Sequence, residues 1–339
     1  MSENIIRAYA ATSPHSALTR YDYDAGDLQA DEVEIKVHYC GICHSDISMI
    51  DNAWGYSSYP LVAGHEIIGK IVRLGSNTKG LYIGQTVGVG WTAASCQHCN
   101  PCIGGNAGYC NEAVPTIVHM GGFADKVRAQ WQWVIPIPEG MDIAKAGPLL
   151  CGGITVFEPL LQHGIHAGHK IGVIGIGGLG HLALAFFNAW GCEVTAFSSK
   201  PTKYDEIRAM GAHHILDSTD SASLDSAKGS LDLIVSTVNV PLNWSTYMDL
   251  LKLEGKLHIV GAVLEPLEIH AFSLINGARS LTGSSTGSPI QLRTMMDFAA
   301  RKNIKPIVEE FPMSKINDAL QHLRDGKARY RIVLKNDFA

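Results

Sequence analysis

The sequence predicts an α/β fold with two domains: a β-rich domain and a parallel, doubly wound sheet inserted near the end of the chain. Two observations lead to this prediction. Alternating apolar and polar residues dominate the first half, and regular strand–helix alternation begins near Leu150. A third observation is the return to a strand-like run over residues 328–335. We therefore predict one domain from residues 1–150 and 284–339, and a second from residues 151–283.

The composition is that of a globular protein. The 339 residues suffice for two domains, and 46% are hydrophobic while 17% are charged. The net charge of −5 argues against nucleic-acid binding, and no apolar stretch is long enough to span a bilayer. The N-terminal residues lack a signal-peptide pattern, and most of the eight cysteines are placed like ligands. We expect a cytoplasmic protein that binds neither nucleic acid nor membrane.

The β-rich half contains two clear strand patterns. The runs EVEIKVHY (residues 32–39) and IIGKIVRLG (residues 67–75) alternate as half-buried strands do, and glycine-rich turns separate such runs.

The second half alternates between strands and helices, which predicts a parallel sheet. The predicted strands are residues 171–174, 192–199, 231–238 and 255–262, and the predicted helices are residues 181–191, 200–212 and 241–253. A glycine- and serine-rich segment near Ser284 then leads into a helix over residues 292–300.

A glycine motif follows the first of these strands. Gly175, Gly177 and Gly180 form G-x-G-x-x-G around Gly178 and Leu179, directly before a predicted helix. The first glycine permits a tight turn, the second lets the backbone approach a pyrophosphate, and the third lets helix and strand pack closely. The motif predicts dinucleotide binding; the alternative is a purely structural glycine turn.

The end of the second strand favours NADPH over NADH. An acidic residue there would bind the ribose 2′-hydroxyl of NAD, but this chain has Ser198, Ser199, Lys200 and, slightly later, Lys203. Hydroxyl and ammonium groups can bind a 2′-phosphate. The alternative is that both lysines are simply solvated.

Four cysteines lie close together in the first half, at Cys96, Cys99, Cys102 and Cys110. Four thiolates can close a tetrahedral site around one zinc ion, which leaves no room for a substrate. We therefore predict a structural zinc. The alternatives are free thiols, two disulfides or an iron–sulfur cluster.

Three further residues could form a second zinc site that stays open. Cys43, His65 and Cys151 supply two thiolates and one imidazole, the ligand set of a catalytic zinc with a free fourth position. They are far apart in sequence, so each could equally be a core residue.

Several motifs together resemble one family across essentially the whole chain. They are GICHSD (41–46), GHEIIG (64–69), the four-cysteine segment, LLCGGIT (149–155), GIGGLG (175–180), SSKPTK (198–203) and ARYRIV (328–333). The chain resembles the zinc-dependent medium-chain alcohol dehydrogenases, within them the cinnamyl-alcohol dehydrogenase group, and most closely the bacterial NADPH-dependent broad-range aldehyde reductases. This resemblance implies a GroES-like domain with an inserted Rossmann domain.

The resemblance also implies two zinc ions per chain. It assigns a catalytic zinc to Cys43, His65 and Cys151, and a structural zinc to the four-cysteine segment. Glu66 resembles a residue that approaches the catalytic zinc when a ligand exchanges; the alternative is a carboxylate that only hydrogen-bonds behind the ligands. Asp46 resembles the carboxylate that orients the ligand histidine.

The resemblance also assigns roles to single residues outside the ligand set. Ser45 resembles the hydroxyl that passes a proton to the zinc-bound oxygen, but the histidine through which many relatives continue this relay is replaced by Ser48. That replacement leaves the exit of the relay open, since serine does not titrate near neutrality. Trp54 and Trp91 resemble the walls of an apolar substrate pocket, although either could be a core residue.

The implied cofactor contacts extend beyond the glycine motif. His44 and Thr155 lie near the cofactor in relatives, and Val260 and Gly261, at the end of the strand predicted over residues 255–262, are also expected to contact it. Arg331 resembles an arginine that binds the pyrophosphate, although Arg329 could be confused with it.

The remaining candidates are interpreted as having no role in the chemistry. Cys40 and Cys192 are read as packing residues. The histidines of the nucleotide domain are expected to be scattered on its surface, with a further metal site as the alternative; they are His163, His166, His169 and His181.

The predicted function is that of an oxidoreductase of class EC 1.1.1. It would transfer hydride reversibly between NADPH and an aldehyde, giving a primary alcohol, with a broad range of aliphatic and aromatic aldehydes. One alternative is an NAD-linked alcohol dehydrogenase of the same superfamily; the other is a non-catalytic zinc- or nucleotide-binding module. The resemblance further implies a homodimer, or a tetramer, formed through the nucleotide domains.

Overall fold

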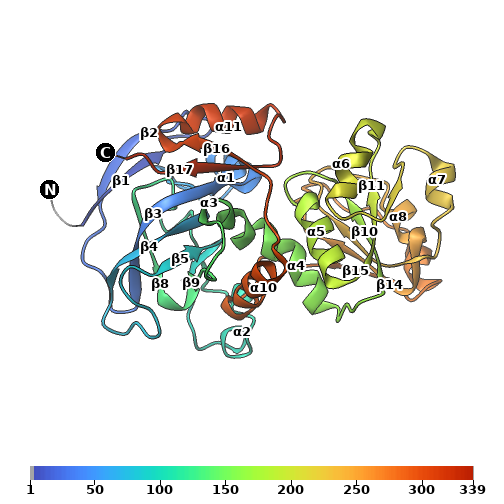
Figure 1. Cartoon of the computed structure of the whole chain (residues 1–339), viewed down its shortest axis with the longest axis horizontal. Coiled ribbons are helices and arrows are strands. Elements are labelled where there is room, and N and C mark those ends of the chain that lie inside the picture. Colours follow the sequence, from blue (N-terminus) through green and yellow to red (C-terminus); the bar gives the residue numbers. More distant parts are fainter. Residues whose placement is uncertain (1–3, 339) are drawn as a thin grey trace. The chain divides into compact units, whose positions relative to one another are not determined.

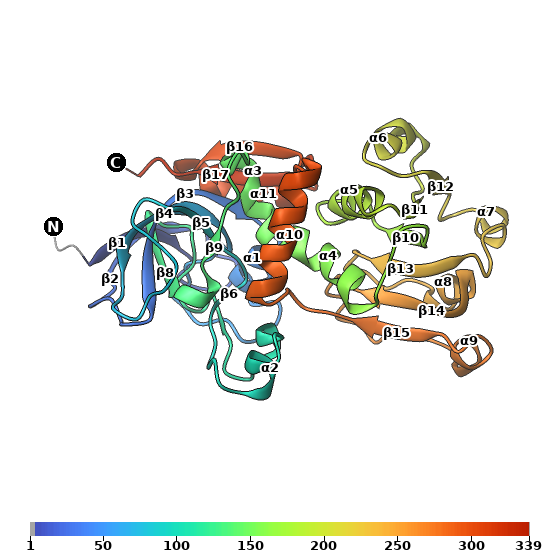
Figure 2. The same cartoon turned by 60° about the horizontal axis from the view of Figure 1, so that its bottom comes forward.

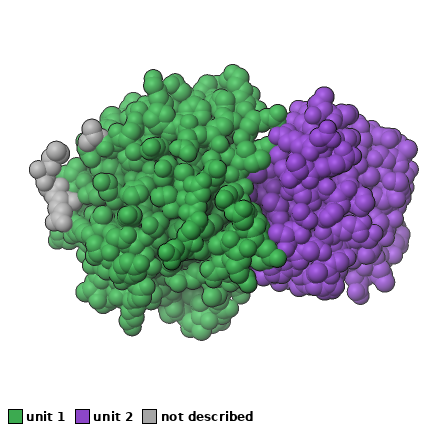
Figure 3. Space-filling view, viewed as in Figure 1, with its two compact units in different colours: residues 1–154, 286–339 green, residues 155–285 purple. Residues whose placement is uncertain are grey.

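The computed structural model describes residues 4–338, and the chain divides into two compact units (Figure 3). Unit 1 contains the chain up to Ile154 and from Thr286 onward, and unit 2 contains Thr155–Ser285. The first boundary therefore falls inside helix α4 (Gly152–Gln162). The boundaries predicted from the sequence lay after residues 150 and 283.

A seven-stranded sheet forms the centre of unit 1. Its order is β16-β17-β3-β4-β5-β9, with β8 also paired to β3, and Figure 1 shows β17 beside β3. These strands are β3 (Glu32–Ile42), β4 (Glu66–Leu74), β5 (Thr86–Val89), β8 (Lys126–Gln130), β9 (Ile135–Pro136), β16 (Val308–Pro312) and β17 (Arg331–Lys335). The strands predicted at residues 32–39 and 67–75 are thus confirmed as β3 and β4. Because β17 pairs with β3, the end of the chain completes the first domain.

Two smaller strand pairs belong to the same unit. They are β1 (Ile5–Ala10) with β2 (Thr19–Asp24), and β6 (Thr92–Ala94) with β7 (Val114–Pro115). In β3 the side chains of Val33, Ile35 and Val37 are buried at every second position, as the alternating pattern predicts.

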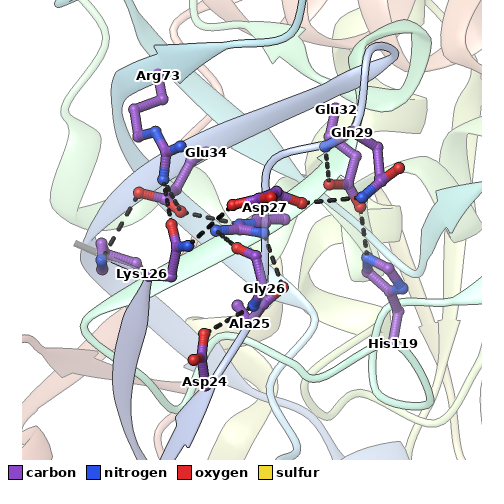
Figure 4. Close-up of polar contacts among 12 residues, drawn as sticks. Asp24, Ala25, Gly26, Asp27, Gln29, Glu32, Glu34, Arg73, His119 and Lys126 are labelled. Carbon is purple, nitrogen blue, oxygen red and sulfur yellow. Dashed lines mark hydrogen bonds and ion pairs between the residues drawn. The ribbon is translucent and has the colours of Figure 1, made fainter. Parts of the chain in front are cut away.

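The buried carboxylate of Glu34 lies in a network of polar contacts that joins the end of the β1–β2 pair to the main sheet. Glu34 is 1% exposed, and its carboxylate accepts a hydrogen bond from Arg128 Nε at 2.8 Å. Lys126 and Arg73 also point toward it, at 3.6 and 3.7 Å (Figure 4). Arg128 donates in addition to the carbonyl of Ala25. These partners offset the cost of burying a charge.

The helices of unit 1 are short apart from α10. They are α1 (His44–Ile50), α2 (Asn100–Ile103), α3 (Ile143–Ala146), α10 (Pro289–Lys302), α11 (Ile316–Arg324) and the 3₁₀ turns η1 (Ala107–Tyr109), η2 (Trp131–Trp133), η3 (Gly147–Leu150) and η5 (Met313–Lys315). Helix α10 contains the predicted helix 292–300 and is longer, since Ser288 and Gln291 cap its start and Asn303 ends it with a φ of 53°. Within residues 4–338, no helix combines the length and apolar character that crossing a membrane requires.

Unit 2 is built on a six-stranded parallel sheet. Its order is β12-β11-β10-β13-β14-β15, so the strand order reverses between β10 and β13. The strands are β10 (Lys170–Ile174), β11 (Glu193–Phe197), β12 (His214–Leu216), β13 (Leu231–Ser236), β14 (Leu251–Ile259) and β15 (Ser280–Gly283). Read in chain order this is 3-2-1-4-5-6, the arrangement that binds dinucleotides at the carboxyl ends of the strands beside the reversal. The predicted doubly wound sheet is confirmed.

Helices connect these strands, and α5 and α8 lie on opposite faces of the sheet (Figure 2). They are α4, α5 (Gly180–Trp190), η4 (Pro201–Lys203), α6 (Tyr204–Ala209), α7 (Ser221–Asp225), α8 (Trp244–Leu250) and α9 (Ala271–Ile275). The helix predicted over residues 241–253 was too long. The chain passes directly from α8 into β14 at Leu251, because the buried Leu250 and Leu251 satisfy a helix and a strand equally well.

Candidate active site

The first candidate site gathers residues from three distant parts of unit 1. One ligand atom from each of Cys43, His65, Glu66 and Cys151 lies within 4.8 Å of the others. Cys151 Sγ is 3.9 Å from Cys43 Sγ and 3.2 Å from His65 Nε2. Two sulfurs bound to one tetrahedral zinc at about 2.3 Å would be roughly 3.8 Å apart. The donor types and their spacing therefore fit zinc.

Local structure fixes each of these side chains. Cys43 precedes α1, His65 precedes β4, and Cys151 lies between η3 and α4. The backbone at Gly64 has a φ of +96°, and a Cβ atom there would meet Phe123 at 2.6 Å. Only glycine fits before His65 in this conformation, so the tight turn is part of the site.

Asp46 orients the imidazole of His65 by contacting its Nδ1 atom. Its Oδ1 lies 2.9 Å from His65 Nδ1 and also accepts the N–H of Gly64, while its Oδ2 accepts the N–H of Cys43. Asp46 is fully buried. A carboxylate in this position keeps the proton on Nδ1, so that Nε2 is free to bind a metal.

Glu66 and Arg331 form a buried ion pair beside the ligand set. The guanidinium Nη2 of Arg331 donates to Glu66 Oε1. Burial raises the pKa of Glu66 to about 7, and the guanidinium opposes that rise. Among the described residues, Glu66 Oε2 has no hydrogen-bond partner. Gly41 makes room for this oxygen, since a Cβ at Gly41 would lie 2.0 Å from it.

The side chains predicted around the reacting groups also lie in unit 1. Ser45 Oγ is 3.7 Å from Cys43 Sγ. The ring of Trp91 packs edge-on against His65 at 5.0 Å, and Trp54 packs against Trp91 at 6.1 Å. Both indoles are half-buried. The sequence-predicted proton donor and pocket walls thus sit around the same ligand set.

The four-cysteine segment forms a second cluster. The sulfurs of Cys96, Cys99, Cys102 and Cys110 all lie within 4.8 Å of one another, with Cys96 Sγ 3.9 Å from Cys102 Sγ and 3.5 Å from Cys110 Sγ. Backbone N–H groups, first that of His98 and then that of Cys99, lower the pKa of Cys96 to about 6. Four thiol groups at this spacing fit a closed zinc site. Sequence reasoning missed a further group here, in which Cys96, His98 and Glu112 also come together.

In unit 2 the glycine motif lies at the carboxyl end of β10. Gly175 has a φ of +85°, and a Cβ at Gly180 would lie 1.9 Å from the carbonyl oxygen of Gly175. A Cβ at Gly177 would meet nothing within 4 Å. The turn between β10 and α5 is therefore tight, with open space beside Gly177, and Gly178 and Leu179 complete it. This cradle fits a pyrophosphate at the start of α5.

Two residues that sequence reasoning missed support this turn. Thr237, just after β13, donates through Oγ1 to the carbonyl of Gly175 at 2.7 Å. His181 Nδ1 lies 3.1 Å from the carbonyl oxygen of Gly177. The sequence could have indicated both residues. Thr237 lies at the end of a predicted parallel strand, and His181 lies in the first turn of the predicted helix.

The end of β11 carries the predicted phosphate-binding segment. Ser198 is half-buried and its Oγ accepts the N–H of Lys200 at 3.3 Å, while Ser199 and Lys200 are exposed. Lys203 ends the turn η4. No carboxylate occurs among residues 198–203.

The other predicted cofactor contacts divide between the units. Val260 and Gly261 follow β14, and both donate their N–H groups to the carbonyl of Ser236. Thr155 also belongs to unit 2, whereas His44 and Arg331 belong to unit 1. His44 is exposed and Arg331 is 5% exposed.

The expectation of scattered surface histidines was wrong for His181 and holds for the exposed His166, while His163 and His169 are half-buried. His181 is buried under the glycine turn, and His163 Nε2 lies 2.9 Å from Nδ1 of the buried His258. The rings of His166 and His169 lie against each other at a tilt of 35°, with centroids 3.7 Å apart. Within residues 4–338, no cluster of three or more possible metal ligands includes any of the four. Cys40 and Cys192 are buried thiols.

Comparison with known families matches both parts of the chain. Residues 29–139 match the alcohol dehydrogenase GroES-like domain, and residues 178–301 match the zinc-binding dehydrogenase domain.

Individual proteins are similar over nearly the full length. An aldehyde reductase of a Synechocystis species is 50% identical, over 98% of this chain and 99% of that protein. A probable cinnamyl alcohol dehydrogenase of Oryza sativa is 37% identical, over 97% and 95%.

Solved structures are also similar over nearly the full length of the chain. A cinnamyl alcohol dehydrogenase of Sorghum bicolor has a TM-score of 0.93 at 36% identity, over 98% of this chain and 97% of that one. The cinnamyl alcohol dehydrogenase of Helicobacter pylori, solved with NADP(H), has a TM-score of 0.89 at 32% identity, over 98% of each chain.

Proposed function

The chain belongs to the zinc-binding alcohol dehydrogenases, and we propose that it reduces aldehydes to primary alcohols with NADPH at a zinc held by Cys43, His65 and Cys151. Aldehyde and alcohol oxidoreduction is the activity of its relatives, including the 50% identical aldehyde reductase.

The observation that carries this proposal is the difference between the two clusters. The first has two thiols and one imidazole, with Glu66 already paired to Arg331, while the second has four thiols. Three protein ligands leave a position for a substrate, and four do not. The first cluster would therefore hold the catalytic zinc and the second a structural one, which gives two zinc ions per chain.

The residues around the first cluster have separate tasks. When bound, zinc would supply Lewis-acid polarisation of the carbonyl group, and the nicotinamide cofactor would supply the hydride. Asp46 fixes the orientation and tautomer of His65. Trp91 and Trp54 exclude water beside the imidazole. The reduced oxygen must gain a proton, and the hydroxyl of Ser45, whose Oγ is 3.7 Å from Cys43 Sγ, would donate it.

NADPH is favoured by the chemistry at the end of β11. Ser198, Ser199 and Lys200 offer hydroxyl and ammonium donors, and no carboxylate stands nearby in residues 198–203 to repel a 2′-phosphate. The similar Helicobacter pylori protein was solved with NADP(H), which supports this choice.

Two further expectations belong to the same proposal. All eight cysteines are free thiols, which suits a reducing cytoplasm. A homodimer, or a tetramer, is expected from the resemblance, and light scattering of the purified protein tests it.

The experiment compares initial rates of aldehyde reduction by zinc-loaded protein with NADPH and with NADH, on one aromatic and one long aliphatic aldehyde. The proposal predicts turnover with a strong preference for NADPH. Faster turnover with NADH would keep the reaction and contradict the cofactor assignment. No turnover with either cofactor, in protein that carries two zinc ions, would contradict the proposed function.

A further inference from the structure

A row of aromatic rings leads outward from the ligand set in unit 1. Trp91 packs edge-on against His65 at 5.0 Å, Trp54 packs against Trp91 at 6.1 Å, and Tyr56 stacks on Trp54 at 6.1 Å with an interplanar angle of 21°. His65 is fully buried, whereas Tyr56 is 52% exposed. The row therefore connects the first cluster to the surface of the unit.

Hydrogen bonds hold the segment that carries Trp54 and Tyr56 against α1. Ala53 donates its N–H to the carbonyl of Ser48 at 2.8 Å, and Ser57 Oγ donates to the carbonyl of Met49 at 2.6 Å. Because α1 starts directly after Cys43, these bonds fix the two rings relative to the ligand set.

An ion pair between Asp51 and Arg324, the last residue of α11, restrains the same segment. Both oxygens of Asp51, the residue that ends α1, accept hydrogen bonds from the guanidinium of Arg324, at 2.5 and 2.7 Å. Asp51 is mostly buried, and the guanidinium of Arg324 lowers the pKa of its carboxyl. A bidentate pair of this kind restricts the orientation of both groups.

Tyr56 differs from the other aromatic residues of the row in how little it contributes to packing. Trp54 and Trp91 pack against the hydrophobic core of unit 1, whereas Tyr56 lies outside that core and stacks on Trp54. Stacked aromatic side chains offer a large, rigid apolar surface at low entropic cost. Such a surface beside a site for aldehydes suits the apolar part of a substrate.

We propose that Tyr56 is a specificity residue, which contacts the far end of long-chain and extended aromatic aldehydes, and that Arg324 positions it through Asp51. This inference rests on the proposed function. A short aldehyde bound at the ligand set would reach Trp91 but not the outer end of the row. Tyr56 should therefore matter for decanal and cinnamaldehyde and have no effect on propanal.

The test compares zinc-loaded wild type, Tyr56→Ala and the matched control Tyr56→Phe on decanal, cinnamaldehyde and propanal. Loss of one stacking surface should lower kcat/KM for the two larger aldehydes by about 5- to 10-fold, mainly through KM, because the contact is the same before and during reaction. The kcat/KM for propanal should stay within about 2-fold, and Tyr56→Phe should behave like wild type.

Arg324→Met supplies a second variant far from the rings. It should raise KM for decanal and leave KM for propanal unchanged. Arg324→Lys, which keeps the positive charge, should raise KM for decanal less. Equal losses on all three aldehydes, or no loss on any, would overturn the inference. Absence of turnover in the wild type would instead overturn the proposed function, so the two failures are distinguishable.

Discussion

Oδ1 of Asp46 lies 2.9 Å from Nδ1 of His65, and this contact determines which imidazole nitrogen is free to bind a metal. Both side chains are fully buried, and the same carboxylate accepts the backbone N–H groups of Cys43 and Gly64. Asp46 thus contacts two of the three proposed zinc ligands, through the backbone N–H of Cys43 and the imidazole of His65.

Replacing Asp46 by asparagine should weaken zinc binding at the first cluster. The amide cannot stabilise the Nδ1–H tautomer as a carboxylate does, so we expect a 10- to 100-fold loss of zinc affinity and a parallel loss of turnover. Zinc retained after dialysis against a chelator measures the effect. The control is Asp205→Asn, since Asp205 is fully exposed on α6. Unchanged zinc retention in Asp46→Asn would contradict the assignment.

Replacing Cys102 by serine should remove the structural zinc alone. Metal analysis should fall from two zinc ions per chain to one, and the melting temperature should drop by roughly 5 °C or more, because metal binding contributes to folding stability. The matched control is Cys192→Ser, a buried thiol outside both clusters, which should keep two zinc ions. If Cys102→Ser also keeps two, the four-thiol cluster is not a zinc site.

Placing a carboxylate at the end of β11 should shift the cofactor preference. In Ser198→Asp the new charge would repel a 2′-phosphate and could accept the ribose hydroxyl of NADH, so the ratio of kcat/KM for NADPH over NADH should fall by about 10- to 100-fold. Ser221→Asp adds the same charge at an exposed position of unit 2 and should leave the ratio unchanged. An unaltered ratio in Ser198→Asp would show that this segment does not contact the phosphate.

The contact between the half-buried His163 and the buried His258 predicts a loss of stability in acid. His258 Nδ1 lies 2.9 Å from His163 Nε2, its Nε2 lies 2.9 Å from Ser284 Oγ, and burial followed by the neighbouring His163 lowers the pKa of His258 to about 4. Burial, and then Lys256, also lowers the pKa of His163. In the unfolded chain a histidine titrates near 6.5. The unfolded state therefore binds more protons between about pH 6.5 and pH 4, and the native state loses stability over that window as the pH falls.

The size of this effect can be measured with one variant. His258 alone should account for about 3 kcal/mol of the stability lost between pH 7 and pH 4. Urea unfolding at both pH values should show a smaller loss in His258→Asn than in wild type. His270→Asn replaces an exposed histidine at the start of α9 and should follow the wild type. Equal losses in all three proteins would mean that His258 titrates normally in the folded chain.

Local patterns predicted much of the fold and the residue types of the site. The strand at residues 171–174, the glycine turn after it and the helix beginning near Gly180 were all predictable, because period, glycine spacing and burial agree there. The helix predicted over residues 241–253 was too long, because the apolar residues around Leu251 fit either structure.

Contacts between distant residues could not be predicted in this way. Arg331 was expected to contact the cofactor, and its pairing with Glu66 joins residues 265 positions apart. Nothing in the local pattern around either residue signals the other. The same holds for His163, just after α4, and His258 on β14, which meet although they are 95 positions apart.

The most direct test of the zinc assignment follows aldehyde-dependent NADPH oxidation while zinc is removed from the protein and then returned. If the first cluster holds the catalytic zinc, turnover disappears when this cluster loses its metal, with the four-thiol cluster still occupied, and added zinc restores it. Turnover that persists after the first cluster is emptied would contradict the central claim that Cys43, His65 and Cys151 hold the catalytic zinc.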